Sequence, residues 1–288
     1  MDLTQLEIFR TIAEEGSITG AAEKLHRVPS NISTRLRQLE DELGSELFHR
    51  EKLRLQITDS GRTLLDYARR ILALADEARQ SISGQQPCGI FTLGAIESTA
   101  AVRLPPLISH YHQRWPQVEL DLSTGPSGEM IDGVLSGKYS AAFVDGPPKH
   151  PLLEGIPVFK EELVLIGALN HPPVPNASSI AGSTIYAFRA NCSYRRLFEN
   201  WFARDSAAPG KIFEMESYHG ILACVSAGAG LALIPDSMLE SMPGRDSVQA
   251  WPLSEDMGNI EIWLMWRKST QSANLEAMVG MLRDKGIN

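Results

Sequence analysis

The chain contains only three cysteines, Cys88, Cys192 and Cys224, and they stand far apart in the sequence. An odd number of cysteines without CxxC-type spacing excludes a disulfide framework and a cysteine zinc site. No apolar run approaches the roughly 20 residues that span a bilayer, and Met1 leads directly into a charged amphipathic segment instead of a signal peptide. We therefore expect a cytoplasmic protein with no membrane partner, no metal and no cofactor.

Catalytic signatures are also missing from the sequence. The seven histidines lie outside any recognisable catalytic motif, and no nucleophile is paired with a base. At 288 residues the chain is long enough for a small domain and one or two larger domains, each with its own core. We therefore expect a binding protein rather than an enzyme.

Residues 17–58 combine two short helical patterns, a tight turn and a basic hairpin. Ser17 or Thr19 is predicted to cap a first helix, and residues 26–28 form the break that follows it. Pro29 fits the first turn of a second helix, because its missing N–H would be unpaired there. Residues 47–48 and 53–57 are predicted to form two short strands. The core-facing residues of the second helix repeat at spacings of three and four, and they are Ile32, Leu36, Leu39 and Leu43.

The opposite face of the second helix is polar, which suits a helix that enters the major groove of DNA. Arg side chains match guanine, and Asn or Gln side chains match adenine, while basic residues of the hairpin would contact phosphates. The alternative is an ordinary amphipathic helix pair with a solvated basic face, but the turn, the proline start and the hairpin together favour a DNA-reading unit. The candidate DNA contacts are Arg27, Pro29, Ser30, Asn31, Ser33, Thr34, Arg35, Arg37, Gln38, Arg50, Lys52 and Arg54.

These motifs resemble the winged helix-turn-helix of the LysR-type transcriptional regulators. The family pattern has a first helix that ends in GS, an AA..L helix, an S..S..I..LE..LG..LF.R reader helix, and a threonine and a glycine that open the next helix. The departure is at Val28, Pro29 and Asn31, which replace the commonest TQPAVS-like run and bear on the operator sequence. The resemblance implies double-stranded promoter DNA as a partner and RNA polymerase as a further candidate partner. The matching residues are Gly16, Ser17, Ala21, Ala22, Ser30, Ser33, Leu39, Glu40, Leu43, Gly44, Leu47, Phe48, Arg50, Thr58 and Gly61.

The net charge of the chain is negative, whereas DNA-binding proteins usually have a basic surface. The formal net charge is -8, and residues 1–84 alone contain 12 Lys or Arg against 14 Asp or Glu. DNA affinity must therefore come from local placement of basic side chains and from two copies acting together. A monomer is expected to bind DNA weakly.

Thr58 is predicted to cap a long helix over residues 59–83, and residues 84–89 form a hinge-like break after it. The family resemblance implies that this helix pairs with its copy in a second subunit to form a homodimer, and that dimers associate into a homotetramer. The alternative is that the apolar stripe of the helix packs on its own chain. The stripe is close to a heptad seam and consists of Leu64, Leu65, Ala68, Ile71, Leu72, Ala75 and Ala78.

From residue 90 onward strands alternate with helices, an order typical of a parallel sheet covered by helices. Two similar halves that share two crossing strands predict a bilobed clamp, which resembles the periplasmic-binding-protein-like effector domain of the family. A transport-type solute-binding protein would share this clamp but not the DNA-reading unit. The predicted fold is α/β overall, with a mainly α winged helix-turn-helix (1–58), a linker and dimerisation helix with a hinge (59–89) and an effector domain (90–288; lobe I 90–160 and 267–288, lobe II 161–266).

Ligands of open α/β sheets gather at the carboxyl ends of strands and at helix N-termini. Glu97 and Asp145 suit a cationic group, while hydroxyls and backbone amides suit an anionic end, so an amine or amino-acid-like effector is predicted. Each acid could instead be a helix cap or a solvated loop residue. The runs HRVPSN, ESTAA and STGPSGEM resemble regulators of putrescine utilisation. The candidate effector contacts are Glu97, Ser98, Thr99, Thr124, Gly125, Ser127, Asp145, Cys192, Ser193 and Tyr218.

Cys192 supports an alternative function, a redox-sensing regulator. It is predicted to begin a helix that has arginines close in sequence, a setting that lowers the pKa of a thiol and favours oxidation. The resemblance also implies this role, because peroxide-sensing members of the family carry a reactive cysteine in a comparable region. No convincing resolving partner is present, since Cys88 lies in the hinge and Cys224 in an apolar helix. The other expectation for this thiol is packing or ligand contact.

Overall fold

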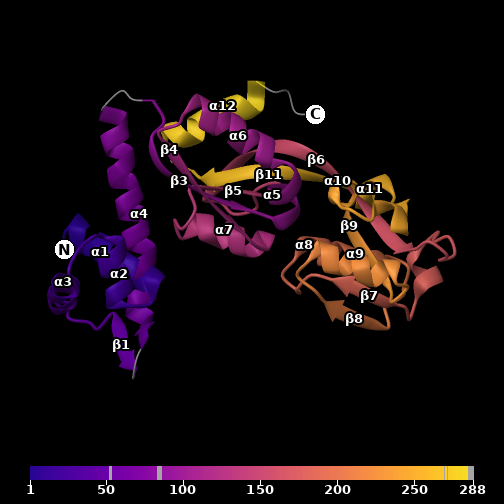
Figure 1. Cartoon of the computed structure of the whole chain (residues 1–288), viewed down its shortest axis with the longest axis horizontal. Coiled ribbons are helices and arrows are strands. Elements are labelled where there is room, and N and C mark those ends of the chain that lie inside the picture. Colours follow the sequence, from indigo (N-terminus) through magenta and orange to yellow (C-terminus); the bar gives the residue numbers. More distant parts are fainter. Residues whose placement is uncertain (52–53, 83–85, 269, 271, 285–288) are drawn as a thin grey trace. The chain divides into compact units, whose positions relative to one another are not determined.

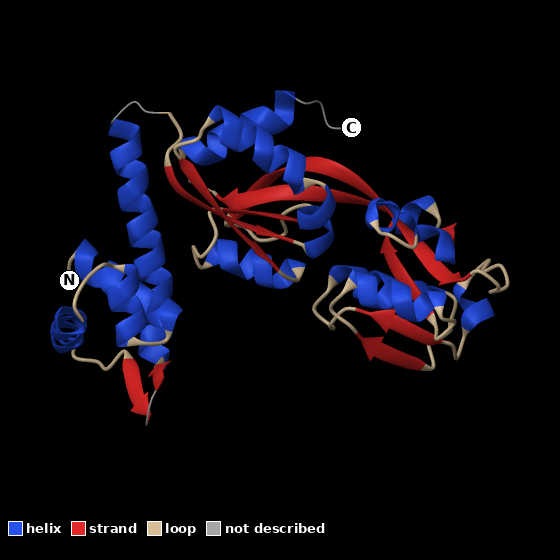
Figure 2. Ribbon diagram, in the orientation of Figure 1, coloured by secondary structure: helices blue, strands red, loops and turns tan. Residues whose placement is uncertain are grey.

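The computed structural model describes residues 1–51, 54–82, 86–268, 270 and 272–284 (Figure 1). The chain divides into two compact units, one formed mainly by Met1–Gln86 and the other mainly by the residues from Pro87 onward. The first unit is largely helical, whereas the second mixes helices and strands (Figure 2). Within the described ranges, no helix is both long enough and apolar enough to cross a membrane.

The helices of the first unit begin where the local sequence predicts them. Asp2 forms a capping box with Gln5 at the first helix, and Ser17 accepts a hydrogen bond from the N–H of Gly20 at the second. The third helix starts at the predicted proline and ends at Gly44, whose φ of 64° is left-handed. The elements are α1 (Leu3–Glu15), α2 (Ile18–Lys24), α3 (Pro29–Leu43), β1 (Phe48–Glu51), β2 (Arg54–Ile57) and α4 (Asp59–Ile82).

The first three helices share one apolar core, which includes Phe9, Ile12, Ile32 and Leu39. Three of the four predicted core residues of α3 are buried there. The prediction for Leu43 was wrong, because this side chain is 42% exposed. Leu43 is the last residue of α3 and lies outside the buried cluster, so helical spacing alone overestimated how far the core extends.

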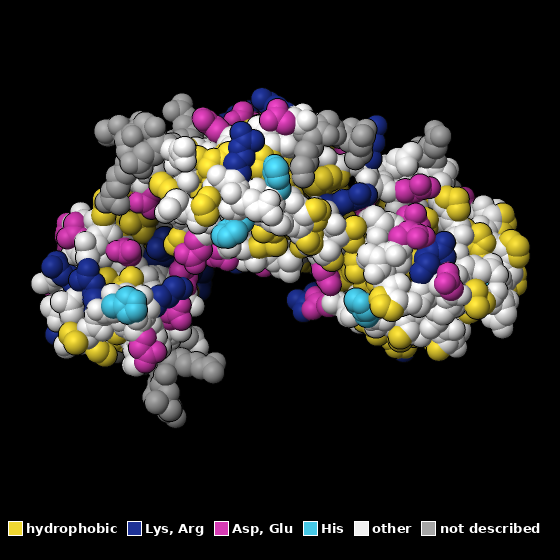
Figure 3. Space-filling view, turned by 45° about the horizontal axis from the view of Figure 1, so that its top comes forward, with side chains coloured by type: hydrophobic (Ala, Val, Ile, Leu, Met, Phe, Trp, Pro, Cys, Tyr) yellow, Lys and Arg dark blue, Asp and Glu magenta, His cyan; other side chains and the backbone are white. Residues whose placement is uncertain are grey.

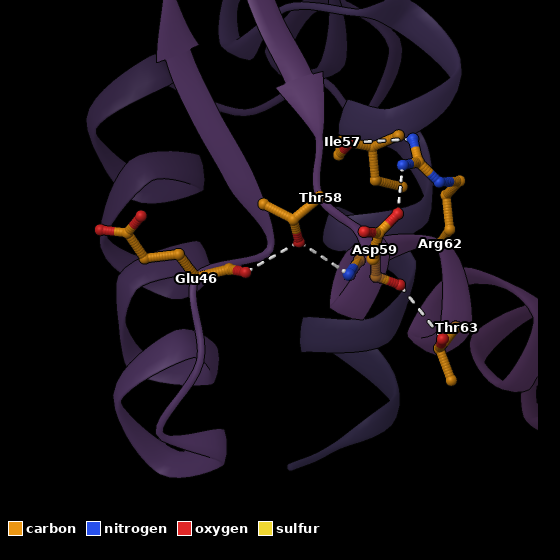
Figure 4. A network of polar contacts seen from close by, with 7 residues as sticks. Glu46, Ile57, Thr58, Asp59, Arg62 and Thr63 are labelled. Atoms are coloured by element: carbon orange, nitrogen blue, oxygen red, sulfur yellow. Dashed lines mark hydrogen bonds and ion pairs between the residues drawn. The ribbon is translucent and has the colours of Figure 1, made fainter.

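The predicted hairpin is present, with β1 antiparallel to β2, and Thr58 caps the helix that follows it. The Thr58 hydroxyl donates to the carbonyl of Glu46 and accepts from the N–H of Gly61, each at 2.9 Å (Figure 4). Gly61 is required by a close approach, because a Cβ there would lie 2.3 Å from the carbonyl oxygen of Leu47. The threonine and glycine of the family pattern therefore join the hairpin to the start of α4.

The apolar stripe of α4 packs in part on its own chain. Ala68 is fully buried in the core of the first unit, and four neighbours on the helix, Leu64, Leu65, Ile71 and Leu72, are partly buried against it. By contrast, Leu74 is 63% exposed and Tyr67 is also exposed. The alternative of packing on the same chain thus holds for the first part of the stripe, and the dimer seam stays a prediction.

The second unit is built on a sheet whose strand order is β4-β3-β5-β11-β6-β9-β7-β8, with β10 paired to β6. The parallel pairs predicted from the alternating pattern are present: β3 with β4 and β5, and β7 with β8 and β9. The strand bounds are β3 (Gly89–Ala95), β4 (Val118–Thr124), β5 (Ala141–Asp145), β6 (Leu153–Ala168), β7 (Thr184–Ala187), β8 (Lys211–Glu214), β9 (Leu231–Pro235), β10 (Val248–Pro252) and β11 (Asn259–Arg267).

One strand, β6, crosses between the two halves of the sheet. Nine of the first ten residues of β6 pair with β11, while residues 163–166 pair with β9 and residues 164–168 with β10. One continuous strand thus takes part in both halves of the sheet. β11 also pairs with β5 over residues 262–266, so it lies beside the first-half strands. The predicted lobe boundaries remain a prediction.

Helices cover the sheet halves of the second unit (Figure 2). The first two helices meet at Arg103, and prolines occupy the first turn of the second. The helices are α5 (Glu97–Val102), α6 (Leu104–Arg114), α7 (Ser127–Leu135), α8 (Ser193–Arg204), α9 (Tyr218–Ser226), α10 (Asp236–Ser241), α11 (Glu255–Gly258) and α12 (Ala273–Asp284), with short 3-10 turns η1 (Ala177–Ile180) and η2 (Arg245–Ser247).

A partly buried ion pair joins the α5–α6 junction to β6. Glu161 is only 4% exposed, and its carboxylate accepts from Arg103 Nε at 2.8 Å and from the hydroxyl of Ser237 on α10. Arg103 also donates to the carbonyl of Lys160 at 3.3 Å. The carboxylate is therefore compensated on both oxygens inside the protein.

Candidate DNA-reading surface and effector cavity

The polar side of α3 is exposed over most of its length. Five predicted DNA contacts lie on this outward side, and we call them the reading face: Ser30, Asn31, Thr34, Arg37 and Gln38. Arg27 and Pro29 are exposed just before it. Because the apolar residues of the same helix are buried on the other side, the reading face is free to approach the edges of bases.

Ser33 and Arg35 flank the reading face instead of lying at its centre. Both are only partly exposed, and the guanidinium of Arg35 lies 4.0 Å from the carboxylate of Asp2. The structure therefore places Arg35 beside the start of α1. The hairpin contacts Arg50, Lys52 and Arg54 lie outside the side chains that the structure describes.

Charge is mixed on the molecular surface. On the face drawn in Figure 3, basic side chains (dark blue) and acidic side chains (magenta) are interspersed, and neither sign forms a continuous field. This agrees with the excess of acidic residues in the sequence. This face therefore offers no broad basic surface, in line with the expectation that DNA contact depends on a few placed cations.

A cavity of about 310 Å³ lies in the second unit, where the starts of α5, α7, α8 and α9 converge. Strand ends and helix N-termini supply its polar groups, as the α/β pattern predicts. The lining residues are Ile96, Glu97, Ser98, Thr124, Gly125, Pro126, Ser127, Glu129, Phe188, Arg189, Cys192, Ser193, Tyr194, Glu216 and Tyr218. The volume fits a small metabolite.

Eight of the ten candidate effector contacts lie in this lining: Glu97, Ser98, Thr124, Gly125, Ser127, Cys192, Ser193 and Tyr218. Thr99 and Asp145 do not. Asp145 accepts a hydrogen bond from the hydroxyl of Ser127 and so acts behind the wall. Thr99 is buried, and its hydroxyl has no hydrogen-bond partner among the described residues.

Seven lining residues are not among the candidate effector contacts: Ile96, Pro126, Glu129, Phe188, Arg189, Tyr194 and Glu216. Arg189 Nη2 donates to Glu216 Oε2 at 2.7 Å, so the one arginine of the lining already has a carboxylate partner. These two residues come from different connecting segments, 27 positions apart. Their position after β7 and β8, at the same edge as Glu97, was the available signal.

Hydroxyl groups bridge the two sides of the cavity. The Ser98 hydroxyl lies 3.4 Å from the Tyr194 hydroxyl, and the Ser127 hydroxyl lies 3.4 Å from that of Ser193. Burial raises the pKa values of both Tyr194 and Tyr218, so these phenols are neutral hydrogen-bonding groups. The wall therefore offers neutral donors and acceptors around its charged residues.

Glu97 is the electrostatically distinctive residue of the cavity. Burial raises the pKa of its carboxyl, the nearby Glu216 raises it further, and His219 opposes them. Among the described residues, Glu97 makes no ion pair. Its charged form is thus poorly compensated in the unligated protein, and a cation would compensate it.

Cys192 lies in the cavity wall as the residue that precedes α8. Burial raises the pKa of its thiol, although the backbone N–H groups of Arg195 and Tyr194 lower it. Arg196 also lowers this pKa, as the sequence predicted for the neighbouring arginines, but the effect of burial is larger. Arg189 and Arg195 form ion pairs with Glu216, Glu199 and Glu214. Among the described residues, Cys88, Cys192 and Cys224 form no disulfide with one another.

Family profiles match nearly the whole chain. Residues 3–62 match the bacterial regulatory helix-turn-helix protein family of the lysR type, and residues 84–286 match the LysR substrate binding domain. The chain belongs to the LysR family of transcriptional regulators. It is therefore a DNA-binding regulator with an effector-binding domain, and the expectation that it is not an enzyme is confirmed by this membership.

Named relatives match along their full length. The regulator GltR of Bacillus subtilis is 34% identical over 286 residues, which cover 99% of this chain and 97% of GltR. YusT of the same organism, described as an uncharacterized HTH-type transcriptional regulator, is 35% identical, with 94% and 91% of the two chains covered. These relatives give no support to the resemblance to putrescine utilisation.

Solved structures share the fold of the chain. A full-length OxyR variant from Pseudomonas aeruginosa has a TM-score of 0.79 at 22% identity and covers 98% of this chain and 95% of its own. CbnR in complex with its target DNA has a TM-score of 0.69 at 22% identity, with 99% and 100% covered. The predicted fold, a winged helix-turn-helix followed by a bilobed α/β effector domain, is thereby confirmed.

Proposed function

We propose that this LysR-type regulator reads promoter DNA with the reading face of α3 and responds to a small cationic effector, an amine or an amino-acid-like metabolite, in the α5–α9 cavity. The observation that carries the effector class is Glu97, a carboxylate that is partly withdrawn from water and makes no ion pair among the described residues. Glu129 and Glu216 add negative charge to the lining, and the single arginine is already paired with Glu216. A cation is the ligand that this charge balance favours.

The hydroxyls of Ser98, Ser127 and Ser193 would accept or donate hydrogen bonds at the other end of the effector. Asp145 supports the wall through Ser127 rather than as a direct contact. Coupling to DNA would follow from closure of the cavity, which changes how the effector domains pack between subunits. Assembly into a dimer or tetramer and contact with RNA polymerase remain parts of this proposal.

Replacing Glu97 with Gln should weaken an amine effector at least tenfold without unfolding the protein, because a charged hydrogen bond in a closed site contributes about 1.5–3 kcal/mol. Isothermal titration with putrescine, aminobutyrate and simple dicarboxylates measures the effect. Glu276→Gln, an exposed carboxylate on α12, is the matched control and should leave affinity unchanged. Binding of a dicarboxylate alone, with no effect of Glu97→Gln, would exclude the cationic effector and leave the regulator assignment intact.

The affinity for an amine should also depend on pH through Glu97. Since the pKa of this carboxyl is raised in the unligated protein, protonation competes with the amine, and affinity should rise with pH until the carboxyl is fully ionised. In the absence of ligand the sign for stability is opposite, because ionisation of the poorly compensated carboxyl destabilises the folded state as pH rises. Glu97→Gln should remove both trends, as followed by titration and thermal melts across the carboxyl range. Identical profiles for the two proteins would assign the pH dependence to another group.

The reading face can be tested by comparing a substitution within it with a substitution beside it on the same helix. Arg37→Ala should cost about 1–3 kcal/mol at one base position and relax sequence preference there, because a guanidinium is suited to guanine. Arg35→Ala is the matched control on the same helix, and it should change preference less because Arg35 lies beside Asp2. Fluorescence anisotropy on selected and scrambled duplexes separates the two. Unchanged specific affinity in Arg37→Ala would remove that residue from the reading face.

A further inference from the structure

The residue that precedes the first turn of α3 is apolar. Val28 holds the N-cap position with extended backbone angles, and no side chain caps this helix. The other helices of the helix-turn-helix, α1 and α2, both carry a polar side-chain cap. A valine cannot accept the hydrogen bond that Ser, Thr, Asp or Asn would accept there. The position is therefore not optimised for starting the helix.

Val28 is also exposed, so burial of this aliphatic side chain does not contribute to the stability of the fold. Its side chain is 62% exposed, and its neighbours Arg27, Pro29 and Ser30 are exposed as well. Asn31 and Thr34 of the reading face follow within two helical turns. The Val28 side chain is thus a single exposed aliphatic group beside a surface that is otherwise polar and basic.

The turn that carries Val28 is held firmly. The N–H of Arg27 donates to the carbonyl of Ala22 at 2.8 Å, and the N–H of His26 donates to that of Glu23 at 3.1 Å. His26 has a φ of 51°, a left-handed conformation that non-glycine residues rarely adopt. Valine is itself restricted at χ1. The methyl groups of Val28 are therefore presented with little freedom to lose on contact.

We propose that Val28 determines operator specificity by contacting the C5-methyl group of a thymine in the major groove. The N-terminal residues of a recognition helix are those that reach base edges. Thymine presents the apolar methyl group of the major groove, whereas the other edge atoms are hydrogen-bond donors or acceptors. This inference rests on the proposal that α3 carries the reading face. It adds an apolar residue, which a search for hydrogen-bonding side chains would not identify.

Uracil substitution tests the contact, because uracil lacks only the methyl group. Duplexes selected from a random library by the full-length protein are resynthesised with each thymine in turn replaced by uracil, and affinities are measured by fluorescence anisotropy. One thymine in each half-site should be sensitive, with about a fourfold loss per methyl for the wild type. Val28→Ala should bind the thymine and uracil duplexes equally.

Two further variants keep recognition separate from folding. Val28→Ser supplies the missing cap and should raise the melting temperature while losing thymine discrimination. Leu43→Ala, which truncates the exposed aliphatic residue at the far end of α3, should discriminate as the wild type does. Uracil insensitivity of the wild type, or undiminished discrimination by Val28→Ala, would overturn the inference. If the wild type selects no sequence, the reading-face proposal itself fails.

Discussion

Replacing Arg103 with Ala should lower the free energy of unfolding of the second unit by about 3–5 kcal/mol, because it leaves the buried carboxylate of Glu161 without its cation. Ser237 would remain as a partner, but a hydroxyl does not neutralise the charge. All five tryptophans lie after residue 86, so urea unfolding followed by tryptophan fluorescence reports on this unit.

Two variants show whether the missing cation is the cause. Arg245→Ala breaks a surface pair with Glu240 and should change stability by no more than about 1 kcal/mol. The double variant Arg103→Ala with Glu161→Gln should recover part of the loss, since no charge is then left buried. If the double variant is as unstable as Arg103→Ala alone, the loss comes from packing of the arginine stem and not from charge.

The local signals of the first unit were enough to predict its helices. Ser17, Pro29 and Thr58 mark helix starts by chemistry that acts within a few residues, and each marks the observed start. The failure at Leu43 has the same origin, because spacing shows which face of a helix is apolar but not where the core ends. The sequence also could not show which part of the apolar stripe on α4 packs against α1.

The position of the cavity could be predicted from the strand ends, but the pairing of its charged side chains could not. Most candidate contacts belong to the first turn after a strand, where topology dictates convergence. The pairing of Arg189 with Glu216 joins two connecting segments whose approach depends on the whole second half of the sheet. The ion pair of Arg103 and Glu161 likewise spans 58 positions. Such partners follow from tertiary structure, which periodicity does not encode.

Replacing Leu74 with Asp should dissociate the assembly along α4 while leaving the first unit folded. Tyr67, Ile71, Leu74 and Ala78 follow each other at spacings of four, three and four, which places them on one side of the helix. Leu74 is the most exposed large apolar residue of this row, so a partner helix would bury it. A charge buried in such a seam costs several kcal/mol, which exceeds a hundredfold change in the dissociation constant.

Light scattering should then give particles of lower mass, with the far-ultraviolet circular dichroism of the wild type. Leu72→Asp is a poorer probe, because Leu72 packs against the core of its own chain and its replacement should unfold the first unit instead. Leu43→Asp adds the same charge at an exposed leucine on α3 and should keep the wild-type mass. If Leu74→Asp also keeps that mass, α4 does not hold the subunits together through this row. If Leu74→Asp does dissociate, weak DNA binding is the expected companion result, since the few basic side chains of one DNA-reading unit need a second copy to bind tightly.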